Sequence, residues 1–106
     1  ARKILGYIEL VWTCDVVVQK IQGHKILHQL RRNGSDLNAV WPAANLTNTQ
    51  RIGQATETYT IWFSAGGREY DLRTSDYSLY QQAYPGSEWE LEVNQLGAVT
   101  SAQPAN

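Results

Sequence analysis

The stretch "ETYTIWFSAGGREYDLRT", residues 57–74, alternates apolar and polar residues on both sides of a glycine pair. Alternation with period two is typical of strands that bury one face, and Gly-Gly between two such runs is typical of a hairpin turn. The buried face is expected to carry Tyr59, Ile61, Phe63, Tyr70 and Leu72, and the opposite face Thr58, Thr60 and Trp62. This hairpin predicts a β fold, and the flanking segments are interpreted around it.

Downstream, residues 76–83 are expected to form a short helix, capped by Ser75 or Asp76 and ended by Pro85-Gly86. The segment "SEWELEVN", residues 87–94, then alternates apolar residues with glutamates and predicts another strand. A last short strand is expected in "AVTSA", residues 98–102, and the tail over residues 102–106 is expected to fray.

Upstream, the alternation over residues 7–19 predicts one long strand. Its apolar face carries Trp12, Cys14, Val16 and Val18. Residues 20–32 fit either a strand with a bulge at Gly23 or a short helix that ends at Asn33-Gly34, and the strand is favoured because Gly23 weakens a helix. Residues 35–55 are expected to be a loose connection, with room for a short strand at 37–41.

These segments predict a single β-rich domain over residues 1–106, with its clearest β core at 56–101. The expected fold is mainly β: a small antiparallel β-barrel or curled sheet of five to six strands, with one short helix before the penultimate strand. With 42% apolar residues, the chain has enough material for a core without disulfides or metal ions.

The net charge of −1 gives no general reason to expect a nucleic-acid partner, so nucleic acid is an unlikely ligand. The charge is unevenly distributed: residues 1–53 carry seven Lys and Arg against three Asp and Glu, and residues 54–106 carry two against seven. Strands from the two halves that pair and neutralise each other are favoured over a bipolar surface. No apolar run is long enough to span a bilayer. A start at Ala-Arg-Lys predicts a processed or excised chain, with a membrane tether possible in missing flanks.

A family resemblance enters at Gly67-x-x-Tyr70, the one-turn helix, Pro85-Gly86 and "WELEVNQLGAV", residues 89–99. This order resembles small β-domains of uncharacterised bacterial envelope-associated proteins, over residues 56–101. The resemblance implies no activity and no functional residue. It favours a bacterial cell envelope over the cytoplasm, without settling the compartment.

Residues capable of catalysis or metal binding are sparse. His24 and His28 would lie about 13 Å apart on a strand, too far to share an ion. Cys14 shares its face with apolar residues, which is typical of a core thiol. Glu88, Glu90 and Glu92 collect on one strand face, as polar residues of any alternating strand do, with Lys20, Lys25 and Arg31 as expected cross-strand partners. We therefore predict no enzyme activity, no catalytic residue, no metal site and no cofactor.

Aromatic side chains are the candidate binding residues. Tyr77, Tyr80 and Tyr84 share one face of the expected helix and form either a plug over an open end of the barrel or a contact surface. Trp62 lies on the polar face of its strand, and Trp41, in the loose connection, either covers it or forms part of the same contact surface.

The sequence thus predicts a non-catalytic interaction or assembly domain, a subunit or soluble part of a larger bacterial protein complex that binds a protein partner or itself. The alternative function is a binder of single-stranded nucleic acid or oligosaccharide, with Trp62, Tyr77 and Tyr80 as stacking platforms. That alternative requires four basic residues to gather beside the rings: Lys20, Lys25, Arg31 and Arg32.

Overall fold

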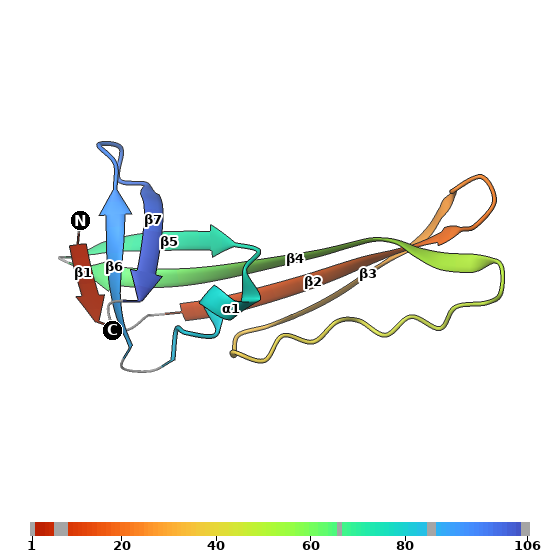
Figure 1. Ribbon diagram of the computed structural model, residues 1–106, viewed down its shortest axis with the longest axis horizontal. Helices are drawn as coiled ribbons and strands as arrows, with labels where there is room; N and C mark the ends of the chain where they lie inside the picture. Colours follow the sequence, from red (N-terminus) through yellow and green to blue (C-terminus); the bar gives the residue numbers. More distant parts are fainter. Residues whose placement is uncertain (1, 6–8, 66, 85–86, 105–106) are drawn as a thin grey trace.

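The computed structural model describes residues 2–5, 9–65, 67–84 and 87–104, in which the chain forms two antiparallel sheets and one short helix (Figure 1). The larger sheet has the strand order β3-β2-β4-β5, and the smaller has the order β1-β6-β7. The larger sheet consists of β2 (Glu9–Lys20), β3 (Ile26–Gly34), β4 (Gln50–Ala65) and β5 (Arg68–Thr74). The smaller consists of β1 (Arg2–Leu5), β6 (Glu88–Val93) and β7 (Val99–Pro104), and α1 spans Tyr77–Tyr80.

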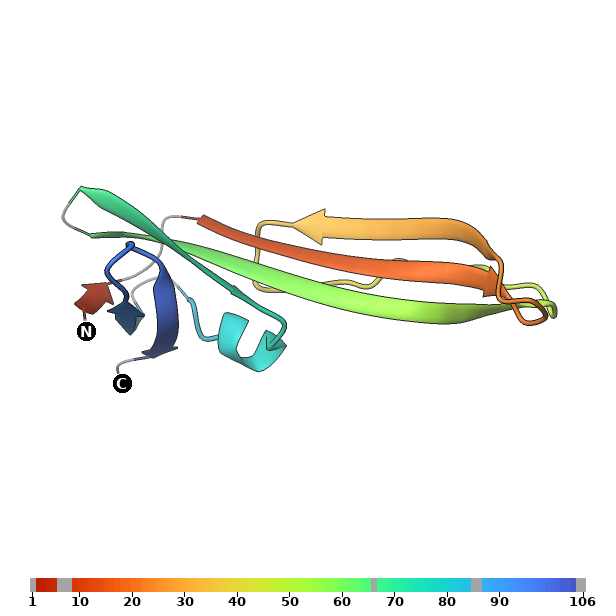
Figure 2. The same ribbon diagram turned by 90° about the horizontal axis from the view of Figure 1, so that it is seen from above.

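The molecule is elongated because β2, β3 and the first half of β4 project from the rest as an arm (Figures 1 and 2). Its principal extents are 53 × 28 × 21 Å and its radius of gyration is 17.4 Å, whereas a compact chain of this length has a radius of gyration of about 13 Å. The 16 residues of β4 account for the longest extent, since a strand rises about 3.3 Å per residue. We call the part of the sheet that contains residues 13–20 of β2, together with the residues of β3 and β4 that pair with them, the arm. The opposite end of the molecule is the base.

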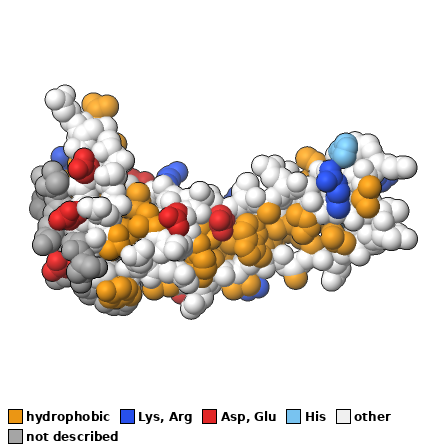
Figure 3. Space-filling view, viewed as in Figure 1, with side chains coloured by type: hydrophobic (Ala, Val, Ile, Leu, Met, Phe, Trp, Pro, Cys, Tyr) orange, Lys and Arg blue, Asp and Glu red, His pale blue; other side chains and the backbone are white. Residues whose placement is uncertain are grey.

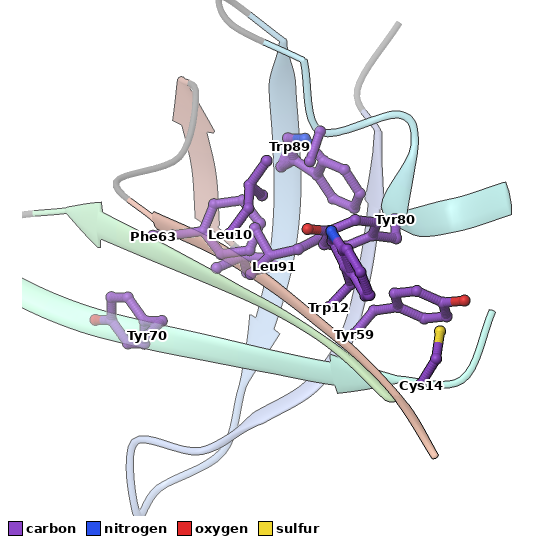
Figure 4. Close-up of a cluster of buried hydrophobic side chains, with 11 residues drawn as sticks. Leu10, Trp12, Cys14, Tyr59, Phe63, Tyr70, Tyr80, Trp89 and Leu91 are labelled. Atoms are coloured by element: carbon purple, nitrogen blue, oxygen red, sulfur yellow. The ribbon is translucent and has the colours of Figure 1, made fainter. Parts of the chain in front are cut away.

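The base holds the main hydrophobic core (Figure 4). Trp89 and Leu91 of β6 are fully buried against the face of the larger sheet that carries Phe63 and Ile61. The rings of Phe63 and Trp89 lie 5.5 Å apart, and the indole Nε1 of Trp89 donates to the hydroxyl of Ser87 at 3.1 Å. The smaller sheet thus covers one end of the larger one, and the two sheets share this core.

The helix begins at Asp76, whose carboxylate accepts from the backbone N–H of Leu79 at 3.2 Å. It packs Tyr77 and Tyr80 on the ring of Tyr59, with centroid distances of 5.3 and 4.9 Å. The irregular connection over residues 35–49 runs beneath the same face of the sheet, from the base to the far end of the arm (Figures 1 and 2). This face, which includes Cys14, Val16 and Val18, is therefore covered along its length.

The mainly β, antiparallel architecture is confirmed, as is a short helix before the penultimate strand. The barrel is wrong: the larger sheet stays open, with β3 and β5 as its edges. Closure of a sheet requires strands of matched length and tilt, and β4 extends far beyond β5. The predicted faces are confirmed, because the apolar side of β2 and Tyr59, Ile61, Phe63 and Tyr70 are buried.

Several boundaries differ from the prediction. Residues 20–32 are a turn followed by β3, so Gly23 lies in a turn, with a φ of 78°, rather than in a bulge. Residues 37–41 form no strand, and β4 begins at Gln50, inside the expected connection. The last strand continues to Pro104 rather than fraying from residue 102. The expected start of the first long strand at residues 7–8, and the helix stop at Pro85-Gly86, lie outside the described residues.

Candidate functional site

The structure places the helix tyrosines in packing roles. Tyr80 is fully buried and donates its hydroxyl to the carbonyl of Asp36 at 2.6 Å. The Tyr77 hydroxyl donates to the carbonyl of Leu37 at 3.0 Å and accepts from the N–H of Ala39 at 3.2 Å. The rings therefore pack on the core, as the plug interpretation expects. Their hydroxyls bind the start of the connection.

A tryptophan strengthens this anchor from the other side. The indole Nε1 of Trp12 donates to the carboxylate of Asp36 at 2.8 Å, and the N–H of Asn38 donates to the same oxygen at 3.1 Å. The bond from Trp12, followed by that from Asn38, holds the pKa of Asp36 below its ordinary value. The carboxylate fixes the point at which the connection enters the covered face.

The opposite face of the larger sheet, which we call the open face, is not covered by any element that the structure describes. Side chains of the central strand β2 that point to it remain only half-buried, although strands flank them on both sides. Its members, in paired rows along β2 and β4, are Val11, Thr13, Asp15 and Val17 with Thr60, Thr58, Thr56 and Gln54. This surface of valine, threonine, glutamine and aspartate is mixed in polarity, and Thr60 is its buried member.

An ion pair and a shallow hollow mark the arm side of the open face. Arg31 of β3 donates from Nε and Nη2 to the two carboxylate oxygens of Asp15, at 2.7 and 3.1 Å. The hollow beside this pair has a volume of about 340 Å³ and is lined also by Val17, Gln29 and Thr56. Both charged side chains keep substantial exposure, at 64% and 34%, so the pair orders the surface more than it stabilises the fold.

The two candidate tryptophans lie on opposite sides of the sheet. Trp62 is half-buried at the base end of the open face, where its strand neighbours are Glu9 and Asp71. Trp41 is 42% exposed in the connection that runs beneath the covered face. Trp41 therefore does not cover Trp62, and the two form no joint surface. Tyr84, the third tyrosine, is 50% exposed beyond the end of α1.

The glutamates of β6 do not face the basic residues of the arm. The glutamate row of β6 lies at the base, where Glu90 is opposite Lys3 and Gln103 in register. The expected partners Lys20, Lys25 and Arg31 belong to the other sheet, on the arm, so that pairing is wrong. The described ion pairs of Arg31 with Asp15 and of Arg73 with Asp71 each join residues of the same half. Strands of the two halves do pair, β1 with β6 and β2 with β4, but the described ion pairs do not join the two halves.

The titratable side chains of His24 and Tyr59 make hydrogen-bonding contacts with neighbouring side chains. No cluster of three His, Cys, Asp or Glu side chains suited to a metal ion occurs in the part of the chain that is described. The Nδ1 atom of His24 lies 2.9 Å from Nη2 of Arg51 at the end of the arm. Burial, and then the bond to Glu57, raises the pKa of the Tyr59 hydroxyl.

No helix among the described residues is long and apolar enough to cross a bilayer.

Cys14 is expected to be an inert thiol. It is completely buried on the covered face, and burial raises its pKa, with smaller contributions from Glu57 and Asp15. Because the thiolate is the reactive form, we expect the folded protein to react with a disulfide reagent at neutral pH at least about a hundredfold more slowly than the urea-unfolded chain. Equal rates in the two states would show that the connection does not protect this face.

Sequence reasoning missed the far end of the arm. There the turn after β2 lies beside the turn before β4, joined by a hydrogen bond of 3.0 Å from the N–H of Ile21 to the carbonyl of Thr49. Four exposed aliphatic residues gather at this end from separate segments: Ile21, Ile26, Leu46 and Ile52. No single run of sequence carries this pattern; only the absence of Asp and Glu from residues 16–35 and 37–56 could have drawn attention to it.

No family model, curated protein or solved structure matches this chain.

Proposed function

We propose that this chain is a non-catalytic interaction domain of a larger bacterial assembly, which binds a protein partner through the open face of its larger sheet. The observation that carries the proposal is the half-exposed row of Val11, Thr13 and Val17 on a central strand, with Trp62 at one end. Sheets in stable domains cover apolar and aromatic side chains with a second layer. A partner that supplies this layer would bury Trp62, a residue type that dominates binding energy at interfaces.

The mixed composition of the open face favours a protein over a small-molecule ligand. The hollow beside Asp15 and Arg31 is lined by charged and polar side chains as well as by aliphatic ones, whereas small-molecule sites are enclosed and mostly apolar. The alternative of a stacking platform for nucleic-acid bases or sugars loses two of its three rings, because Tyr77 and Tyr80 pack on Tyr59. Its cations Lys20 and Lys25 are at the far end of the arm from Trp62.

A photo-crosslinking amino acid at Thr58, which is exposed on the open face, tests this proposal in the cells that make the protein. We expect a crosslink to one defined partner chain, which is lost from the same probe when Trp62→Ala is added, since such anchors contribute about 2 kcal/mol or more. The matched control places the probe at Ala43, which is exposed on the connection, and should give no such product. A free 12.0 kDa monomer in native mass spectrometry, with no crosslink from Thr58, would overturn the proposal.

A further inference from the structure

The end of the arm carries a surface that the proposed partner site does not use. It consists of the two turns at residues 20–26 and 46–52, and we call it the tip patch. The N–H of Lys20 donates to the carbonyl of Lys25 at 2.8 Å, which closes the first turn, and the N–H of Gln50 donates to the carbonyl of Thr47 at 3.1 Å, which closes the second. Gly23 and His24 both adopt left-handed conformations, with φ of 78° and 54°. The tip patch is therefore a defined surface held by the backbone.

Aliphatic side chains are exposed at this end of the arm. Ile21 is 48% exposed, Ile26 54%, and both Leu46 and Ile52 43%. Elsewhere among the described residues, the large hydrophobic side chains with comparable exposure are Val40, Trp41, Tyr84 and Leu96. Of the exposed large hydrophobic residues that the structure describes, half thus lie at one extremity, which is typical of a contact surface rather than of scattered surface residues.

Positive charge surrounds these aliphatic side chains. Lys20, Lys25 and Arg51 belong to the tip patch, and Arg31 and Arg32 follow on β3. Residues 16–35 and 37–56 contain no Asp or Glu. Figure 3 shows Lys, Arg, His and hydrophobic side chains together at the far end of the arm, while the acidic side chains in this view lie toward the base. The molecule is a long electrostatic dipole with an apolar, positive end.

We propose that the tip patch inserts into the headgroup region of an anionic membrane surface. Surface-bound segments combine cations that attract anionic lipid with aliphatic residues that enter the boundary of the acyl chains. The tip patch has both and lacks carboxylates that such a surface would repel. It also stands at the end of a 53 Å molecule, so the acidic base is kept well beyond the Debye length of the lipid charge.

Other anionic partners use only part of this surface. A nucleic acid would engage the cations through its phosphates, but it gives Ile21, Ile26 and Leu46 no apolar environment. The hollow between the two turns, about 560 Å³ and lined by Lys20, Gln22 and Asn48, leaves room for polar headgroups beside the isoleucines. The combination of both chemistries favours lipid.

The test is flotation of the full chain with vesicles of phosphatidylcholine, and with vesicles in which about a third of the lipid is phosphatidylglycerol. We expect binding only to the second kind. The double variant Lys20→Gln/Lys25→Gln should bind about tenfold more weakly or worse. Its matched control, Arg68→Gln/Arg73→Gln, changes the net charge equally at the base and should bind as the unchanged protein does.

A second pair of variants separates insertion from simple charge attraction. Ile21→Ser/Leu46→Ser should lose most of its binding, whereas Leu96→Ser, which removes a 92% exposed aliphatic side chain at the base, should lose none. Near-ultraviolet circular dichroism checks that each variant is folded. Three results would overturn the proposal: no binding by the unchanged protein, equal losses at the two ends, or full binding by the tip serine variant. If a single-stranded oligonucleotide released the protein from the vesicles at a concentration below that of the lipid, the tip patch would be assigned to nucleic acid instead. The tip residues Lys20, Ile21, Lys25 and Leu46 are not members of the open face, so vesicle binding by the tip variants and the crosslink from Thr58 are independent results.

Discussion

Replacing Trp89 by alanine is expected to lower the free energy of unfolding by about 3–5 kcal/mol, the usual cost of removing a large aromatic ring from a core. Trp89 is fully buried, packs on Phe63 with ring centroids 5.5 Å apart, and joins the smaller sheet to the larger one (Figure 4). Its loss also leaves the hydroxyl of Ser87 without its 3.1 Å donor. Urea unfolding followed by fluorescence measures the change, and a domain of marginal stability would be largely unfolded in water.

The matched control is Trp41→Ala, which removes the same side chain from a position that is 42% exposed in the connection. We expect it to cost less than about 1 kcal/mol, as is usual for surface substitutions. Equal losses for the two variants would contradict the packing described here, because they would mean that the connection and the interface between the sheets contribute equally to stability.

The second large effect is expected from Gly34→Ala, at the end of β3. An added methyl group would lie 2.6–2.7 Å from three atoms of the Trp12 indole ring, which is buried and hydrogen bonded to Asp36. The ring cannot move away without breaking that bond, so we expect a loss of about 1–3 kcal/mol, typical of overpacking. Urea unfolding gives the magnitude, and a change in the near-ultraviolet dichroism of the tryptophans should accompany it.

Gly53→Ala is the control for this strain. The three atoms nearest to the added group at Gly53 all belong to the side chain of Gln19, a flexible chain on the arm that can turn aside. The cost should therefore stay near or below about 1 kcal/mol. A double-mutant cycle with Trp12→Phe gives a further check, because the smaller ring relieves the clash and the two losses should fall short of additivity. Simple addition would show that Gly34 acts through something other than the indole.

Much of the fold followed from alternation in the sequence. The pattern from Tyr59 to Phe63, and from Trp12 to Val18, identified the buried faces because each of these strands buries only one side. Residues 50–55 gave no such signal, since all but Gln50 are exposed on both sides of β4 and no side of this stretch is apolar. The sequence therefore places this first part of β4 in the connection and predicts a compact barrel instead of an arm.

The contacts that set the architecture are non-local and left little trace in the sequence. Arg2–Leu5 becomes a strand by pairing with Glu88–Leu91, and four residues are too few to show a period. The tyrosine spacing predicted one face of a helix, but the hydroxyl partners of Tyr77 and Tyr80 lie some forty residues earlier, in a segment without a pattern. Of the candidate binding residues, Trp62 could be placed on its face by parity alone, whereas the tip patch required the fold.

The two tyrosine hydroxyls have a consequence for how the molecule opens. They tie a segment without regular structure to the sheet at one end, while at the other a single backbone bond links Ile21 to Thr49. A segment without regular structure, held mainly near its two ends, opens at a lower free energy than the strands that it covers. We therefore expect the connection to open as a separate cooperative unit. Hydrogen exchange in the arm would then occur when the connection detaches while the base stays folded. The hydrogen bonds of the two tyrosines would set how often the connection detaches.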